Sequence, residues 1–261
     1  MNVSKIPQAI EGNLFELYRT VAEFSKKPIH IGPNVSWVNL TPSPWAGTIF
    51  GADFSASDAG KEIRSVKEQI RLGNAPRSWR TGPSTRPENL EEHLIREGFA
   101  KKWETAGMGM ELSDSPSNVE TPPGLEIENV SNDLALREWA WVVTLGLFNH
   151  PESEADHFYE LMHSAKGCGR LDFFLGRYGC RPATSSASFL SDGVAGIYFV
   201  ATLPEFRRKG LGRSITLAPL RKARDIGAHG AILQASALGE PVYRRLGFQR
   251  YSTMGQFGLV E

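Results

Sequence analysis

Residues 207–214 read RRKGLGRS and bring four cations and two glycines into one short segment. A strand-like run (194–203) precedes the segment, and a helical pattern (214–227) follows it. The first-turn N–H groups of a helix lack partners within the helix, and with the helix dipole they attract anions. Gly210 and Gly212 would let the backbone approach a ligand closely. The segment predicts a phosphate-binding turn, and a solvated basic loop remains the alternative.

Two common phosphate motifs do not fit this turn. The P-loop string G-x-x-x-x-G-K-[ST] does not occur in the sequence. The segment GLGRSI (210–215) lacks the third glycine of a dinucleotide-binding fingerprint. The neighbouring sequence therefore has to decide between a phosphate site and a plain loop.

The segments VATLPEFRRKGLG (200–212) and LQASALGEPVYRRLGF (233–248) together resemble the GNAT superfamily of acyl-CoA-dependent N-acetyltransferases. The pyrophosphate loop of that family follows [RQ]-x-x-G-x-[GA], which Arg207, Gly210 and Gly212 match. The family pattern Y-x-x-x-G-F is matched at 243–248. The resemblance covers about residues 124–261 and implies acetyl-CoA as co-substrate.

The resemblance also implies the cofactor contacts. The strand before the turn would pair its main chain at Val200 and Thr202 with the pantetheine arm. Ser236 stands where the family often has asparagine, seven residues before the tyrosine. The implied cofactor-binding residues are Val200, Ala201, Thr202, Arg207, Arg208, Lys209, Gly210, Leu211, Gly212, Arg213, Ser214, Ser236 and Tyr243.

The mechanism that the resemblance implies is direct acetyl transfer to a primary amine of a small molecule, amino acid or peptide. Tyr243 would protonate the departing thiolate as general acid, although a ring packed beneath the cofactor is the alternative. Several family members carry a glutamate as base near the position of Gly196, where this chain has no carboxylate. The base candidates in FNHPESEADH are His150, Glu152, Asp156 and His157. Residues of these types are more often solvated loop or helix-cap residues than a catalytic base.

An internal repeat appears when residues 149 positions apart are compared, which pairs Ala46 with Ala195. Ten identities fall between residues 46 and 99 without a gap, about three times a chance rate of roughly 6%. Coincidence between two α/β domains is the alternative. The identities are Ala46/Ala195, Gly47/Gly196, Phe50/Phe199, Ala52/Ala201, Arg64/Arg213, Ser65/Ser214, Glu91/Glu240, Arg96/Arg245, Gly98/Gly247 and Phe99/Phe248.

The first half does not keep the chemistry of the second. In the repeat alignment, DAGKEI (58–63) corresponds to RRKGLG (207–212). Lys61 then replaces Gly210, and Ile63 replaces Gly212. Asp58 would repel phosphate, and Leu94 replaces the tyrosine. We hypothesise that this half is a degenerate copy of the transferase fold, structural or forming one wall of the acceptor pocket.

The sequence order predicts a mixed α/β (α+β) fold of two tandem GNAT-like domains. Each would be a mixed, mostly antiparallel sheet flanked by helices. The expected boundaries are 1–112 for the degenerate domain, 113–123 for a Ser- and Pro-rich linker, and 124–261 for the acetyl-CoA-binding domain. Pro219 should kink its helix or remove a hydrogen bond. Trp45 and Trp79 are expected in the core rather than on a ligand surface.

Composition narrows the function classes. Lys and Arg equal Asp and Glu at 29 each, which argues against nucleic acid or an anionic membrane as partner. The two cysteines have no metal or redox spacing, so no metal is expected and a reducing, cytoplasmic location is favoured. The first 20 residues contain no continuous apolar run, so no signal peptide is expected there, and the apolar run 139–148 is expected to form a buried helix.

Three functions stay open at this point. The favoured one is an N-acetyltransferase with one functional CoA site in the second half. The rival is a non-catalytic CoA- or acyl-CoA-binding sensor or partner protein, motivated by the missing strand carboxylate. A nucleic-acid binder that uses the basic turn is the third and weakest. The sequence indicates neither the acceptor, the acyl length, nor the oligomeric state.

Overall fold

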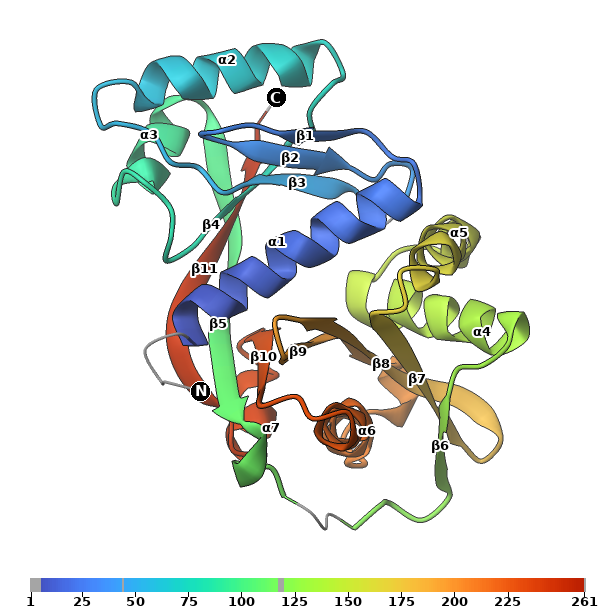
Figure 1. Ribbon diagram of the computed structural model, residues 1–261. Coiled ribbons are helices and arrows are strands. Elements are labelled where there is room, and N and C mark those ends of the chain that lie inside the picture. Colours follow the sequence, from blue (N-terminus) through green and yellow to red (C-terminus); the bar gives the residue numbers. More distant parts are fainter. Residues whose placement is uncertain (1–5, 44, 117–119, 261) are drawn as a thin grey trace.

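One 11-stranded sheet forms the centre of the molecule, in the order β1-β2-β3-β4-β11-β5-β10-β9-β8-β7-β6 (Figure 1). The computed structural model describes residues 6–43, 45–116 and 120–260. The strands are β1 (Ile29–Ile31), β2 (Ser36–Asn39), β3 (Gly47–Phe50), β4 (Ser78–Thr81), β5 (Phe99–Glu111), β6 (Leu125–Asn129), β7 (Leu171–Tyr178), β8 (Arg181–Ser191), β9 (Val194–Thr202), β10 (Gly230–Ala235) and β11 (Gln249–Leu259). The predicted mixed α/β class is confirmed.

Helices cover both faces of this sheet. They are α1 (Ile6–Phe24), α2 (Ala59–Arg71), α3 (Leu90–Arg96), α4 (Asp133–Val143), α5 (Ala155–Lys166), α6 (Leu211–Asp225) and α7 (Glu240–Arg244). On β9, Ala195 and Ile197 join a core cluster with α6, whereas Val194 and Tyr198 join the cluster of α1, α4 and α5. Because neighbouring strand residues point to opposite faces, α6 lies opposite α1, α4 and α5.

Corresponding elements of the two halves follow the 149-residue spacing. Adding 149 to the bounds of β3 gives 196–199, which lies within β9. The same shift carries α3 to 239–245, onto α7, and β5 to 248–260, onto β11. The structure therefore places the sequence repeat on equivalent strands and helices.

The last strand of each half is exchanged with the other half. β5 pairs with β10 along Ala106–Glu111, so a strand of the first half extends the sheet of the second. β11 pairs with β4 between Ser78 and Thr81, so the last strand of the second half extends the sheet of the first. β5 and β11 also pair with each other along their lengths. The two halves are thus joined in one sheet, with the predicted linker 113–123 running from β5 to β6. Of that linker, residues 117–119 lie outside the described residues.

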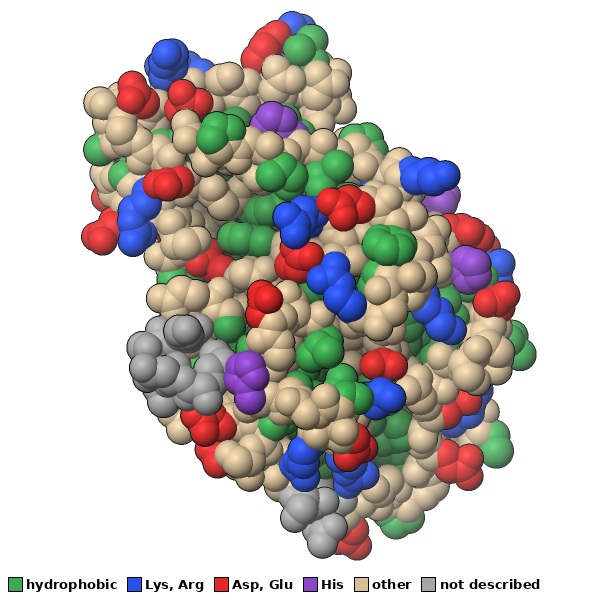
Figure 2. Space-filling view, viewed as in Figure 1, with side chains coloured by type: hydrophobic (Ala, Val, Ile, Leu, Met, Phe, Trp, Pro, Cys, Tyr) green, Lys and Arg blue, Asp and Glu red, His purple; other side chains and the backbone are tan. Residues whose placement is uncertain are grey.

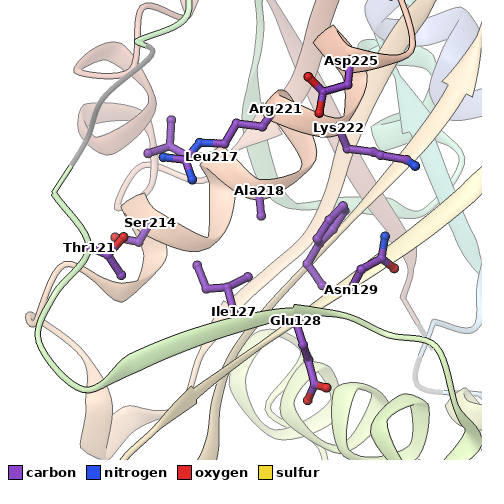
Figure 3. Close-up of a pocket in the computed structure, with 11 residues that line it drawn as sticks. Thr121, Ile127, Glu128, Asn129, Ser214, Leu217, Ala218, Arg221, Lys222 and Asp225 are labelled. Atoms are coloured by element: carbon purple, nitrogen blue, oxygen red, sulfur yellow. The ribbon is translucent and has the colours of Figure 1, made fainter.

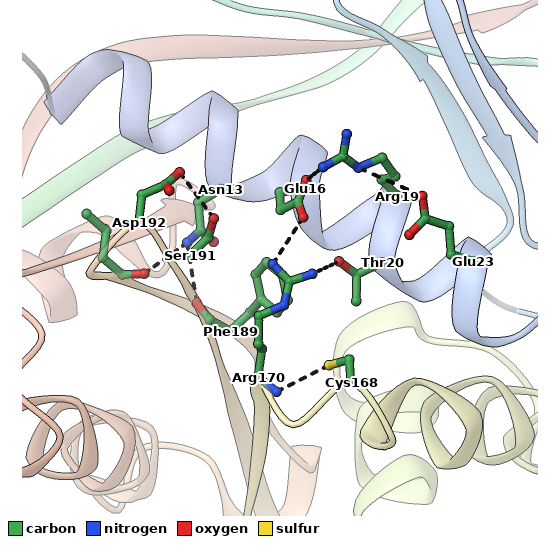
Figure 4. Close-up of polar contacts among 11 residues, drawn as sticks. Asn13, Glu16, Arg19, Thr20, Glu23, Cys168, Arg170, Phe189, Ser191 and Asp192 are labelled. Carbon is green, nitrogen blue, oxygen red and sulfur yellow. Dashed lines mark hydrogen bonds and ion pairs between the residues drawn. The ribbon is translucent and has the colours of Figure 1, made fainter.

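Helix α1 comes from the first half and contacts the second (Figure 4). Asn13 donates to the carbonyl oxygens of Phe189 and Val194, at 3.3 and 3.0 Å. Arg170, just before β7, donates to Glu16 at 3.0 Å and to Thr20 at 2.7 Å. These contacts fix α1 across the second half's strands, so the first helix covers a face that the C-terminal residues alone leave open.

Pro219 sits inside α6 without ending it. Proline has no N–H, so the carbonyl of Ile215 loses its usual helical donor. Ser186 Oγ on β8 donates to that carbonyl at 2.9 Å. The predicted loss of a helical hydrogen bond is compensated from the sheet, and the helix continues to Asp225.

The strand exchange predicts one cooperative unfolding transition. Phe257 on β11 is fully buried in the core of the first half. We expect Phe257→Ala to lower the free energy of unfolding by about 3–5 kcal/mol, because a buried aromatic ring is lost and a cavity remains. Urea unfolding followed by circular dichroism and by tryptophan fluorescence should give one shared midpoint in both proteins. Two separate transitions would contradict the idea that the halves fold as one unit.

Candidate active site

Strands β9 and β10 run parallel and then separate. Their pairing extends only from Gly230 and Val194 to Ile232 and Gly196. Opposite β8, the register of β9 shifts between Tyr198 and Ala201, and within that shift Phe199 takes the left-handed φ of 53°. Such a bulge bends a strand and increases its local twist. The bulge therefore accompanies a gap between the carboxyl-terminal ends of β9 and β10.

The main chain after the bulge is oriented toward this gap. Successive residues of an antiparallel strand alternate between facing the partner and facing away. The N–H of Leu203 donates to Ala183 at the end of β8, at 3.0 Å, so Leu203 faces β8. Thr202 and Val200 then face away from β8, toward the β10 side. This is the orientation that main-chain pairing with a pantetheine arm requires.

The basic turn opens the amino-terminal end of α6. Gly210 is the N-cap residue, with the left-handed φ of 81°, and no side chain caps the helix there. The side chains of Arg208, Lys209 and Arg213 are exposed. A Cβ on Gly212 would lie 3.6 Å from Thr202 Oγ1, so the helix start lies beside the last residue of β9. The turn thus presents free first-turn N–H groups next to the gap.

Arg207 is exposed, but its side chain is bound to the main chain of the protein. Its Nε donates to the carbonyl of Thr202 at 3.0 Å, and its terminal nitrogen donates to the carbonyl of Gly146 at 3.2 Å. Gly146 belongs to the π-helical turn Thr144–Phe148 that follows α4. Arg207 therefore ties the turn to β9 and to the segment after α4, while Arg208 and Arg213 stay available to an anion.

Tyr243 and Ser236 lie together beside the end of β10. A Cβ on Gly239 would be 3.0 Å from Tyr243 Cε2 and 3.4 Å from Ser236 Oγ. Ser236 Oγ accepts the N–H of Gly239 at 3.2 Å, so its oxygen binds the residue that directly precedes the short helix α7. The Tyr243 ring packs edge-on against Phe248, and burial raises the pKa of its phenol to about 12. The phenol stays protonated at neutral pH, as a proton donor must.

A side chain of the first half occupies the space beside Gly196, the position near which several family members carry a glutamate. A Cβ on Gly196 would overlap Asn13 Oδ1 and the ring of Tyr198. Asn13 Oδ1 accepts the Tyr198 hydroxyl at 2.7 Å, and both side chains are buried. No side chain fits at position 196, since α1 occupies that space. Glycine inside a strand is one signal of such a close approach, but nothing nearby in the sequence indicates that Asn13 makes it.

The four candidate bases lie on the surface around the start of α5. His150 Nδ1 is 2.8 Å from Glu154, and Asp156 is 2.8 Å from Arg137. Glu152 and His157 are exposed. Within the described residues, no group of three or more His, Cys, Asp or Glu is arranged to hold a metal ion.

Ser214, which was predicted to bind the cofactor, is buried. Its side chain lines a cavity of about 290 Å³ between α6 and β6, together with Thr121 and Arg221 (Figure 3).

Trp79 is fully buried in the first half, as expected of a core residue. Trp45 is half-buried and packs against Phe199 at the bulge, with ring centroids 5.2 Å apart.

The start of α2, which corresponds to the start of α6, lacks the N-cap glycine and the preceding cations of the basic turn. Helix α2 starts at Ala59 with Asp58 as its N-cap, so the structural counterpart of Gly210 is Asp58 rather than Lys61. Ile63 and Leu94 are fully buried. A carboxylate thus stands at the helix start where the second half has glycine and cations.

Residues 134–248 match the model of the acetyltransferase (GNAT) family. A GCN5-related N-acetyltransferase from Kribbella flavida has the same fold, with a TM-score of 0.72 at 17% identity over 98% of this chain and 95% of that one. A tandem GNAT protein from the clavulanic acid biosynthesis pathway gives a TM-score of 0.58 at 12% identity, over 96% and 94%.

The C-terminal half of this chain is a GNAT acetyltransferase domain. Among curated proteins, the mycothiol acetyltransferase of Catenulispora acidiphila is 27% identical over 74% of this chain and 65% of its own length. That of Pseudarthrobacter chlorophenolicus is 33% identical over 33% of this chain and 24% of its own length. The chain therefore spans less than two thirds of either relative. No helix among the described residues is long and apolar enough to cross a membrane.

Proposed function

We propose that this protein is an acetyl-CoA-dependent N-acetyltransferase that moves an acetyl group to a primary amine of a small molecule, amino acid or peptide. The observation that carries the proposal is the gap between β9 and β10, which opens beside an uncapped helix start with Gly210 in the left-handed conformation. The curated relatives are named mycothiol acetyltransferase, which supports a small-molecule acceptor.

The turn would hold the pyrophosphate. The first-turn N–H groups of α6 would donate to it, and the exposed Arg208, Lys209 and Arg213 would add positive charge. The main chain at Val200 and Thr202 would pair with the pantetheine arm. Arg207 would act through its bonds to Thr202 and Gly146, which keep the end of β9 in place.

Transfer would proceed directly from thioester to amine. The neutral amine attacks the thioester carbonyl while N–H groups of β9 stabilise the oxyanion. Alignment of the two reactants supplies much of the rate enhancement. The Tyr243 phenol would protonate the departing thiolate. No carboxylate stands at Gly196, so the proton of the amine would leave through water or another group.

We expect Tyr243→Phe to lower kcat about 10²-fold, because general-acid catalysis contributes roughly 10²–10⁴-fold. The dissociation constant for CoA should stay within about threefold, since the ring is retained. Initial rates of CoA release across an amine panel check the first value, and calorimetry checks the second. Cys180 is exposed, so Cys180→Ser should be the background when a thiol reagent is used. An unchanged kcat would assign Tyr243 to packing.

A non-catalytic CoA-binding protein is the second candidate function. It is favoured because position 196 is a glycine and carries no carboxylate that could act as a base. CoA binding without turnover on any amine would support it.

We further propose that only the second half binds CoA, since Asp58 stands at the start of α2. Calorimetric titration should give one CoA per chain, and two equivalent sites would contradict the degenerate state of the first half.

A further inference from the structure

The first half contains a cavity of about 520 Å³ that the transferase site does not explain. It lies where the loop between β2 and β3, the loop between α2 and β4, and the strands β5 and β11 meet. Its walls are largely apolar and include Ile70, Pro76 and Phe257. We call it the first-half cavity.

Positive charge and one tryptophan distinguish this cavity. Arg77 and Lys102 line it, and none of the described residues that line it is Asp or Glu. Trp103 also lines it and is 58% exposed, which is unusual for an indole ring. Exposed aromatic rings at the wall of a cavity are typical of ligand and partner contacts. The combination fits an anion with an apolar or aromatic body.

Strand β5 contributes residues to the cavity and also runs past the end of β10 at the candidate active site. Ala106 on β5 pairs with Ala235, the last residue of β10 and the neighbour of Ser236. Trp103 precedes Ala106 by three residues on the same strand, which corresponds to about 10 Å. That distance is comparable to the length of a small amine with an aromatic ring.

The loop between β2 and β3 is a second element that reaches both places. Thr41 and Ala46 of this loop line the cavity. Trp45, in the same loop, packs edge-on against Phe199 at the bulge of β9. The loop that contributes Thr41 and Ala46 to the cavity wall therefore also contacts the strand proposed to hold the cofactor, through Trp45.

We propose that the first-half cavity binds the acyl acceptor and selects an amine that also carries a carboxylate and an apolar, preferably aromatic, body, as in aromatic amino acids. This inference rests on the proposed acetyltransferase function. Lys102 and Arg77 pair with the carboxylate, and Trp103 packs against the apolar body. The amine then extends along β5 toward the end of β10.

The test compares each amino acid with its decarboxylated amine. We expect kcat/KM for phenylalanine to exceed that for phenethylamine at least tenfold, and likewise for tyrosine over tyramine. The double variant Arg77→Met with Lys102→Met should reduce this preference below threefold and leave KM for acetyl-CoA unchanged. Lys101→Met is the matched control, because Lys101 pairs with Glu91 and Glu104 and does not line the cavity.

A binding measurement separates this inference from the proposed function. Calorimetry of phenylalanine against the full chain with CoA present needs no turnover. Binding that Trp103→Ala weakens at least tenfold supports the cavity even if no amine is acetylated, in which case only the proposed function fails. Turnover of amines without a carboxylate preference, or phenylalanine binding that Trp103→Ala leaves unchanged, overturns the inference. Absence of amino acid binding overturns it as well.

Discussion

The variant Gly210→Glu should lose CoA binding, with affinity at least about 10²-fold weaker, which corresponds to about 2.7 kcal/mol. The new carboxylate would stand at the N-cap of α6, where the first-turn N–H groups face the proposed pyrophosphate. It would repel the phosphates and occupy their space. Calorimetric titration with CoA measures the loss, and the urea midpoint shows whether the fold is kept.

A matched substitution separates charge at the turn from backbone strain. Gly169 has a similar left-handed φ of 68°, and a Cβ there meets nothing within 4 Å. Gly169→Glu therefore carries a comparable conformational cost without approaching α6. We expect this control to bind CoA like the wild type. Equal affinity in Gly210→Glu and Gly169→Glu would remove the phosphate assignment from the turn.

Introducing a glutamate at position 196 should destabilise the fold and should not increase the reaction rate. Even Gly196→Ala should lower the free energy of unfolding by about 1–3 kcal/mol, because its Cβ would overlap Asn13 and Tyr198. Gly196→Glu should lower it further, since the buried carboxylate would have no room and no partner. Urea unfolding gives both values, and the rate of CoA release tests for any gain in activity.

Removing the obstructing side chain provides the control. In Asn13→Gly with Gly196→Ala, the new methyl group gains space, so the pair should be less destabilising than the sum of its single substitutions. Additive losses would mean that Asn13 does not occupy the place of the carboxylate. A faster reaction in Gly196→Glu with unchanged stability would contradict the packing that the structure shows.

Local sequence signals were sufficient to predict the order of strand, glycine-rich turn and helix start around residues 207–214. The strand, the glycines and the helix start lie within residues 194–227, so their geometry follows from neighbouring residues. The hydrogen-bond partners of Arg207 could not be predicted from the neighbouring sequence. Its type matches the family loop, but its hydrogen bond to Gly146 spans 61 residues and depends on how α4 packs against β9. The assignment of Arg207 to the phosphate therefore remains a prediction, and the structure places its side chain on the protein main chain.

The repeat was visible in the sequence, whereas the exchange of β5 and β11 was not. Strand pairing is made by backbone hydrogen bonds, which every residue except proline can form. Side-chain patterns identify a strand and its buried face but seldom its neighbour. The same limit applies to Asn13, whose contact with Tyr198 joins residues 185 positions apart.

The sequence by itself determined that the second half is of the GNAT type, and it predicted a phosphate site at the basic turn, because both depend on short segments with fixed residue types. Only the tertiary structure decided that the halves share one sheet, that α1 fills the place beside Gly196, and that a positively charged cavity with Trp103 lies about 10 Å along β5 from the end of β10. Those features depend on contacts between distant segments, and packing and backbone pairing across the whole chain fix them.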